Sequence, residues 1–264
     1  SICGPMRAVI QTGKYSHANG FYNNSNSKFD SSQPTFPKVL QKSGYQTAII
    51  GKWRLMTDPV GYDYWNVLPG QGAYYNPPMT ENGKQVKYEG YCTDIIGDLT
   101  LKWLDGRDKS KPFMMMSQHK APHREWEPPL RHLGFDNDRV YEEPETLFDS
   151  YSGRSKAVSD HDMGIDRTFT ERDAKLVVPG NLTPEQKTAW NAYYEPRNAK
   201  YAAAAPTGRD LVKWRYQRYM HDYLACVKAV DENVGRVLDY LDKNDLAKNT
   251  VVILTSNIGS LHIQ

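Results

Sequence analysis

The sequence predicts an α/β fold in which a mainly parallel central sheet is flanked by helices. Helix and strand signals alternate through the first half of the chain, as they do where helices cross over between parallel strands. Each apolar strand candidate is also followed by a polar loop. The chain has 264 residues, 39% of them hydrophobic, which is enough for an ordinary buried core.

The first helix and strand are expected between Thr35 and Trp53. Thr35 is suited to cap a short helix and Gly44 to end it. The apolar run Thr47-Ala48-Ile49-Ile50 then predicts a buried strand that leads into Gly51-Lys52-Trp53.

A second helix and strand follow from Thr93, a plausible cap. Apolar residues recur after it at helical spacing, and these are Ile95, Ile96, Leu99, Trp103 and Leu104. Lys111-Pro112 then introduces an apolar strand from Phe113 to Met116, and the polar loop Gln118 to His123 follows it.

The last part of the chain predicts a long helix and a third strand. Apolar and aromatic residues mark one face of a helix over residues 209–243. The β-branched run over 249–255 predicts a buried strand that ends at Ser256-Asn257-Ile258-Gly259. Ligands of open α/β sheets bind beyond the carboxyl ends of the strands, so the three strand-end loops are expected to converge on one site.

We expect a single domain over residues 1–264, with an insertion at about 128–206. That stretch is polar, rich in Pro, Asp, Glu and Tyr, and weakly periodic, which favours a lid or a substrate-facing region. The sequence has no initiator Met and its most informative motif lies within its first residues. We therefore expect the chain to be truncated at both ends.

Composition excludes several kinds of partner. The formal net charge is +2, which gives no overall field to attract nucleic acid or an anionic membrane. No apolar run approaches the roughly 20 residues of a membrane span. Cys3, Cys92 and Cys226 lack the paired spacing of zinc or redox sites and allow at most one disulfide.

The opening segment Cys3-Gly4-Pro5-Met6-Arg7 carries the most chemistry. Its proline fixes the backbone and its arginine places a permanent cation near the sulfur, although a lone cysteine is often an ordinary buried residue. Thr12-Gly13-Lys14 and His17-Ala18-Asn19-Gly20 follow at short spacing. Together these segments indicate a functional cysteine.

With these motifs the chain resembles the sulfatases, whose signature is Cys or Ser, any residue, Pro, any residue, Arg. Gly51-Lys52-Trp53-Arg54-Leu55, with Gly61-Tyr62-Asp63 after it, is similar to a second family segment. His119-Lys120-Ala121-Pro122-His123 is similar to a third, and Val251 to Gly259 to a fourth. The resemblance covers nearly the whole chain and implies an alkaline phosphatase-like sandwich.

The resemblance also implies roles for named residues. Cys3 would be converted to formylglycine by a formylglycine-generating or sulfatase-maturing enzyme, and would serve as nucleophile. The other residues with implied catalytic roles are Arg7, Lys52, Arg54 and His123, and those with implied substrate-binding roles are Lys14, Lys120 and His17.

The family's divalent metal, calcium or magnesium, is held by oxygen ligands, and here position 3 and Asn257 are the expected ligands. The chain departs from the family pattern at Met6, usually Ser, and at Arg54, usually His. It departs again at Ile258, which has no donor in its side chain.

The resemblance therefore implies hydrolysis of a sulfate ester, with a sulfated carbohydrate as the expected substrate, by a secreted, periplasmic or lysosome-like enzyme. The carbohydrate rests on the aromatic, polar insertion and on segments similar to those of glycan sulfatases. A phosphonate or phosphate monoester hydrolase of the same superfamily is one alternative. A catalytically silent protein that binds anionic glycans is another, favoured by the departures at Met6, Arg54 and Ile258.

Overall fold

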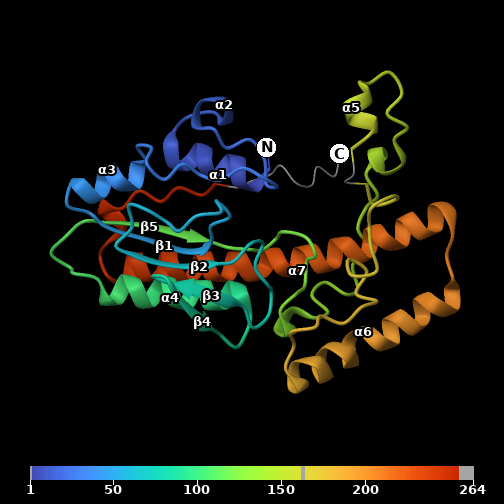
Figure 1. Cartoon of the computed structure of the whole chain (residues 1–264). Helices are drawn as coiled ribbons and strands as arrows, with labels where there is room; N and C mark the ends of the chain where they lie inside the picture. Colours follow the sequence, from blue (N-terminus) through green and yellow to red (C-terminus); the bar gives the residue numbers. More distant parts are fainter. Residues whose placement is uncertain (1, 162–163, 256–264) are drawn as a thin grey trace. The chain divides into compact units, whose positions relative to one another are not determined.

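The computed structural model describes residues 2–161 and 164–255 (Figure 1). The chain divides into two compact units. Of the described residues, the first unit contains those up to Ala121 together with residues 230–255, and the second contains those of Pro122–Ala229. The single domain over 1–264 stays a prediction.

The first unit contains a five-stranded sheet. Its strands are β1 (Gln46–Lys52), β2 (Tyr64–Leu68), β3 (Pro78–Glu81), β4 (Lys84–Lys87) and β5 (Phe113–Gln118). Its helices are α1 (Cys3–Thr12), α2 (Ser16–Asn19), α3 (Phe36–Lys42), α4 (Cys92–Gly106), the last part of α7 (Gly208–Lys243) and η3 (Ala247–Asn249).

The sheet is mixed, in the order β4-β3-β2-β1-β5. Strand β1 pairs in parallel with both β2 and β5, and the hairpin β3–β4 adds antiparallel pairs beside β2. The predicted strands at 47–50 and 113–116 are confirmed as β1 and β5. Gly51 of β1 is in register with Gln118 of β5, so both strands reach their carboxyl ends at the same edge of the sheet.

Helices cover both faces of this sheet, with α1, α2 and α3 on one side and α4 on the other (Figure 1). Side chains that alternate along β1 build the two cores, because successive residues of a strand point to opposite faces. Ile49 packs with Ala8 and Phe21 on the α1 face. Ile50 packs with Ile95 and Ile96 on the α4 face.

The last part of α7 packs closely on α4 at a glycine. A Cβ atom at Gly97 would lie 2.1 Å from Oδ1 of Asn233, so only glycine leaves room for this approach. Asn233 donates a hydrogen bond to Asp94 at 2.8 Å, and Arg236 pairs with Asp98 at 2.5 Å. The predicted helix over 209–243 is confirmed as α7.

The second unit contains η1 (Leu130–His132), η2 (Glu145–Phe148), α5 (Lys156–Ser159), α6 (Pro184–Ala204) and the first part of α7. The weak periodicity of the predicted insertion at about 128–206 gives no sign of α6. This helix begins at a capping box in which Thr183 and Gln186 satisfy each other's backbone amides. It buries only Trp190 and Tyr194, so its apolar periodicity is faint in the sequence.

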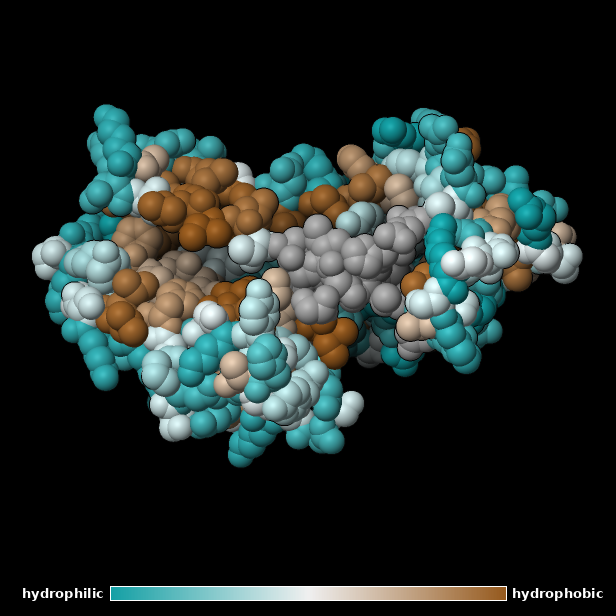
Figure 2. All heavy atoms as spheres, turned by 90° about the horizontal axis from the view of Figure 1, so that it is seen from above, coloured by the Kyte–Doolittle hydropathy of each residue, from teal (hydrophilic) through white to brown (hydrophobic). Residues whose placement is uncertain are grey.

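The predicted third strand over 249–255 is wrong. Residues 251–255 form no strand, and Val251, Val252, Ile253 and Leu254 are exposed. A β-branched run becomes a buried strand only where neighbouring strands pair with it, and no described strand does so here. Figure 2 shows apolar side chains gathered on the face of the sheet-containing unit seen from above, and this run is among that unit's exposed hydrophobic residues.

The ends of two helices differ slightly from the prediction. The N-cap of α4 is Tyr91 rather than Thr93, since the helix begins at Cys92, and α3 ends at Lys42 with Ser43 as its C-cap.

The three cysteines are buried free thiols. Within the described ranges, no helix has both the length and the apolar character to cross a membrane. Asn257 and Ile258 lie outside the described residues.

Gly51 gives a test of how tightly the ends of β1 and β5 are packed. Its φ is +102° and an added Cβ would lie 2.0 Å from the carbonyl oxygen of Gln118. Gly51→Ala should therefore lower the free energy of unfolding by about 2–4 kcal/mol, from strain plus overpacking. Gly44→Ala is the matched control, because Gly44 has a φ of +88° and open space around it. Urea unfolding should show a loss near 1 kcal/mol for the control, and equal losses would contradict the packing argument.

Candidate active site

Cys3 lies buried in the first turn of α1, with 8% of its surface exposed. The turn is fixed by Gly4, whose amide donates to Oδ1 of Asn24 at 2.9 Å. A Cβ at Gly4 would lie 2.5 Å from the ring of Phe21 and 2.7 Å from Asn24 Oδ1. The residue after the cysteine must therefore be glycine for the helix to start in this place.

Arg7, one turn further along α1, joins the helix to the sheet. Its Nη1 donates to the carbonyl oxygen of Lys52 at 2.6 Å and also to Oε1 of Gln118. Lys52 ends β1 and Gln118 ends β5. A single guanidinium thus binds the carboxyl ends of two neighbouring parallel strands, which is the edge where the sequence places the site.

Two buried lysines belong to the same region, Lys52 in contact with Cys3 and Lys120 close enough to Lys52 for its charge to act on it. The Nζ of Lys52 lies 3.7 Å from Sγ of Cys3, and Lys52 is only 2% exposed. Lys120, 6% exposed, places its Nζ 4.5 Å from the centroid of the Tyr74 ring. The structure therefore brings together Cys3, Arg7, Lys52 and Lys120, which are four of the residues predicted from sequence.

Burial and mutual repulsion perturb these cations. Burial lowers the pKa of Lys52 to about 8, with Arg7 and Lys120 acting in the same direction and Cys3 opposing them. Burial likewise lowers the pKa of Arg7 to about 10, again opposed by Cys3. Cations held this way gain stability from any anion that enters, so the cluster is built to receive a negatively charged group.

The sequence reasoning missed two neighbours of this cluster. Gln118 accepts from Arg7, and the only signal for it was its position at the end of an apolar strand. His119 follows it, and burial lowers its pKa to about 4, with Asp94 opposing the shift. His119 is therefore neutral near pH 7, and its buried Nδ1 has no hydrogen-bond partner among the described residues.

Three other predicted residues are not joined to Cys3 by contacts within the described chain. Lys14 and His17 are exposed, and the His17 ring stacks on Tyr15 with centroids 6.0 Å apart. Arg54 has a left-handed φ of 61°. No described group accepts a hydrogen bond from its buried Nε. The roles of all three stay predictions.

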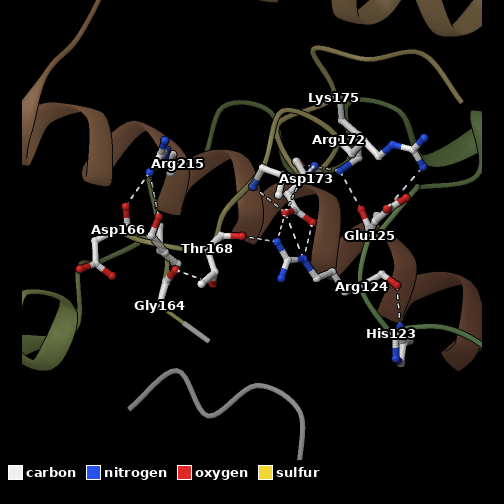
Figure 3. A network of polar contacts seen from close by, with 12 residues as sticks. His123, Arg124, Glu125, Gly164, Asp166, Thr168, Arg172, Asp173, Lys175 and Arg215 are labelled. Atoms are coloured by element: carbon white, nitrogen blue, oxygen red, sulfur yellow. Dashed lines mark hydrogen bonds and ion pairs between the residues drawn. The ribbon is translucent and has the colours of Figure 1, made fainter. Parts of the chain in front are cut away.

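His123 belongs to the second unit. Its Nδ1 lies 2.6 Å from the carbonyl oxygen of Arg124 (Figure 3). A carbonyl can only accept, so Nδ1 carries the proton and Nε2 is the basic nitrogen of the neutral ring. That nitrogen is the one suited to exchange a proton with a substrate.

The expected metal site does not emerge from the described residues. Over residues 2–161 and 164–255 there is no group of His, Cys, Asp and Glu that could hold a metal ion. Of the two expected ligands, Cys3 lies among cations and Asn257 lies outside the described residues.

Comparison with known proteins decides the family. The sulfatase family profile matches residues 1–260. The chain belongs to the sulfatase family. It is 46% identical over 278 residues to an N-acetylglucosamine-6-O-sulfatase of Bacteroides thetaiotaomicron, covering 98% of this chain. It is also 35% identical over 150 residues to an N-acetylglucosamine-6-sulfatase of Capra hircus, covering 48% of this chain.

Solved sulfatase structures agree. One, a complex with its substrate D-glucosamine-2-N,6-O-disulfate, matches with a TM-score of 0.88 at 46% identity over 92% of this chain. The predicted alkaline phosphatase-like fold of a sulfatase is confirmed. This sulfatase chain spans 50% of the length of the Bacteroides relative, 27% of the Capra hircus relative and 53% of the matched structure.

The lowered pKa of Lys52 predicts how anion binding depends on pH. Lys52 loses its charge as pH rises through about 8, so affinity for inorganic sulfate should fall between pH 7 and 9.5. Calorimetry on Cys3→Ala protein isolates this effect, because the thiol that opposes the shift is then absent. The matched variant adds Lys52→Arg, which stays charged and should keep its affinity across this range. A fall of equal size in both proteins would assign the titration to another group.

Proposed function

We propose that this sulfatase hydrolyses the 6-O-sulfate ester of an N-acetylglucosamine-type sugar, with a nucleophile derived from Cys3. The grouping of half-buried Arg7 with the buried Lys52 and Lys120 near position 3 is the observation that carries the proposal. Transfer of a sulfuryl group needs its peripheral oxygens neutralised in a site that excludes water. Cations brought together beside a nucleophile supply that neutralisation.

The surroundings of position 3 fit the formylglycine that the family resemblance implies. Lys52 lies within 3.7 Å of Sγ, so an oxygen-bearing side chain here would meet a cationic donor at once. As its hydrated diol, such a residue would supply one hydroxyl that attacks sulfur and a second that later expels the sulfate. A formylglycine-generating or sulfatase-maturing enzyme is the implied partner.

The chain's own residues then divide the remaining work. Arg7 fixes the turn that carries position 3 by holding the ends of β1 and β5, and Lys52 faces the nucleophile. Lys120 adds charge for a sulfate oxygen. His123 is the proposed general acid, since its protonated Nε2 can give a proton to the departing sugar hydroxyl.

The proposal derives no step through a divalent metal. The described residues around Cys3 offer cations and an amide, whereas calcium and magnesium prefer several oxygen ligands, carboxylates above all. Calcium or magnesium, with Asn257 as a ligand, therefore stays a prediction that rests on the family alone.

The substrate class is supported by relatives from distant sources. A bacterial and a mammalian relative both carry names that specify N-acetylglucosamine 6-sulfate, and the matched structure holds a glucosamine 2-N,6-O-disulfate. A secreted, periplasmic or lysosome-like location belongs to the same proposal.

Sulfate release tests this function directly. The protein should liberate sulfate from N-acetylglucosamine 6-sulfate and from 4-nitrophenyl sulfate, measured by ion chromatography. Cys3→Ala should lower both rates at least about 1,000-fold, because the nucleophile is lost. Cys92→Ala is the matched control, since Cys92 is a buried thiol in the α4 core and should retain activity.

Two further measurements test the alternative functions, a phosphate monoester hydrolase and a silent binding protein. Faster hydrolysis of 4-nitrophenyl phosphate than of the matched sulfate would favour a phosphate monoester hydrolase. Binding of sulfated glycans with no sulfate release from protein whose position 3 is unmodified would favour a silent binding protein. Sulfate release that a chelator abolishes would exclude the silent protein.

A further inference from the structure

The loop around residues 168–175, within the insertion of the second unit, makes a polar network with the segment that carries His123 (Figure 3). The imidazole is held through its Nδ1 by the carbonyl oxygen of Arg124, at 2.6 Å. Both the tautomer and the direction of the ring therefore depend on where the peptide group of Arg124 lies.

Asp173 holds Arg124 by a two-pronged contact. The Nε of Arg124 donates to Oδ1 of Asp173 at 2.8 Å, and its Nη2 donates to Oδ2. The same Nη2 also donates to the carbonyl oxygen of Thr168. The Asp173 side chain is fully buried, whereas that of Arg124 is 36% exposed. Such bidentate pairs fix geometry as well as charge.

Asp173 is itself held within its loop. Its Oδ2 accepts from the amide of Thr170 at 2.7 Å and from the hydroxyl of Thr170 at 2.7 Å. Burial alone would raise the pKa of Asp173, but the bonds from Arg124 and Thr170 outweigh burial and leave the pKa below its ordinary value. The carboxylate is thus charged and fully bonded near pH 7.

The loop is also anchored to the helices α6 and α7. The Nζ of Lys175 donates to the carbonyl oxygens of Glu125 at 2.9 Å and Asp173 at 2.7 Å. The same ammonium pairs with Asp222 of α7 at 3.3 Å, and Asp222 accepts from the hydroxyl of Tyr194 of α6 at 2.7 Å. The side chain of Arg124 and the backbone of Glu125, which follow His123, are therefore both held by the loop around residues 168–175.

We propose that Asp173 is a positioning residue for His123, acting through Arg124. This inference rests on the proposed function, in which His123 protonates the departing sugar hydroxyl. Loss of the Asp173 carboxylate would remove the two-pronged contact to the guanidinium and so loosen the peptide group that holds Nδ1. The proton-donating geometry of Nε2 would be lost while the cation cluster around Cys3 stays in place.

The test compares Asp173→Asn with Asp166→Asn. The first change is isosteric but leaves Arg124 or Thr170 without an acceptor. Asp166 lies in the same insertion, is 55% exposed in its side chain and pairs only loosely with Arg167 at 3.7 Å. Thr170→Val, at an exposed position, removes the hydroxyl that donates to the Asp173 carboxylate and accepts from the Asp173 amide at 3.3 Å, and it serves where Asp173→Asn fails to fold.

The kinetic readout is the dependence on leaving group. A sugar alkoxide needs a proton to depart, whereas 4-nitrophenolate does not. Asp173→Asn should therefore lower kcat for N-acetylglucosamine 6-sulfate about 10- to 100-fold more than kcat for 4-nitrophenyl sulfate. Asp166→Asn should change neither. Equal losses on both substrates would mean a structural role only and would overturn the inference.

A second readout does not require activity. In ¹⁵N spectra of the histidines, assigned with His123→Gln, the His123 ring should be the Nδ1–H tautomer. Asp173→Asn, or Thr170→Val in its place, should move it toward the Nε2–H tautomer favoured by free imidazole. An unchanged His123 signal overturns the positioning role. If the parent protein releases no sulfate, the proposed function fails, and this readout still decides the role of Asp173.

Discussion

The contact of Arg7 with the ends of two strands is the interaction on which the arrangement around Cys3 depends. A guanidinium has several donors in a fixed plane, and here the same Nη1 serves the carbonyl oxygen of Lys52 and the side chain of Gln118. Lysine would supply a charge without that geometry. Because Arg7 lies one turn after Cys3, the place of Cys3 follows from where β1 and β5 end.

The same contact explains why the cations are crowded. Lys52 lies at the carboxyl end of β1, Lys120 lies just beyond the end of β5, and Arg7 comes from α1. Burial lowers the pKa values of Lys52 and Arg7, and repulsion from Arg7 and Lys120 lowers that of Lys52 further, so this arrangement costs folding free energy. A loss of folding stability at a binding site is typical of function, because the binding of an anion there stabilises the protein again.

Patterns within short stretches of sequence predicted much of this fold. Strands β1 and β5 and helices α4 and α7 were visible because each carries its own apolar run or periodicity. Helix α6 was missed because most of its surface is exposed, and the run at 251–255 was mistaken for a strand because composition does not reveal whether a partner strand is present.

Residues of the candidate site were likewise predictable only where a local sequence pattern marks them. Lys52 and Lys120 were predictable because they lie at or just beyond the carboxyl ends of strands and match family segments. Asp173 was not, since it lies 49 residues from Arg124 and nothing near it in the sequence points to that partner. A pairing between two loops is decided by how the chain folds and not by the residues beside either partner in the sequence.

Gly4 carries a consequence for how this family segment can vary. The signature permits any residue between Cys3 and Pro5, yet here Phe21 and Asn24 fill the space that a side chain would need. Variation at this position is therefore tied to the residue at 21. Homologues with a larger residue after the cysteine should carry a smaller one in place of Phe21, a correlated substitution that an alignment of close relatives would reveal.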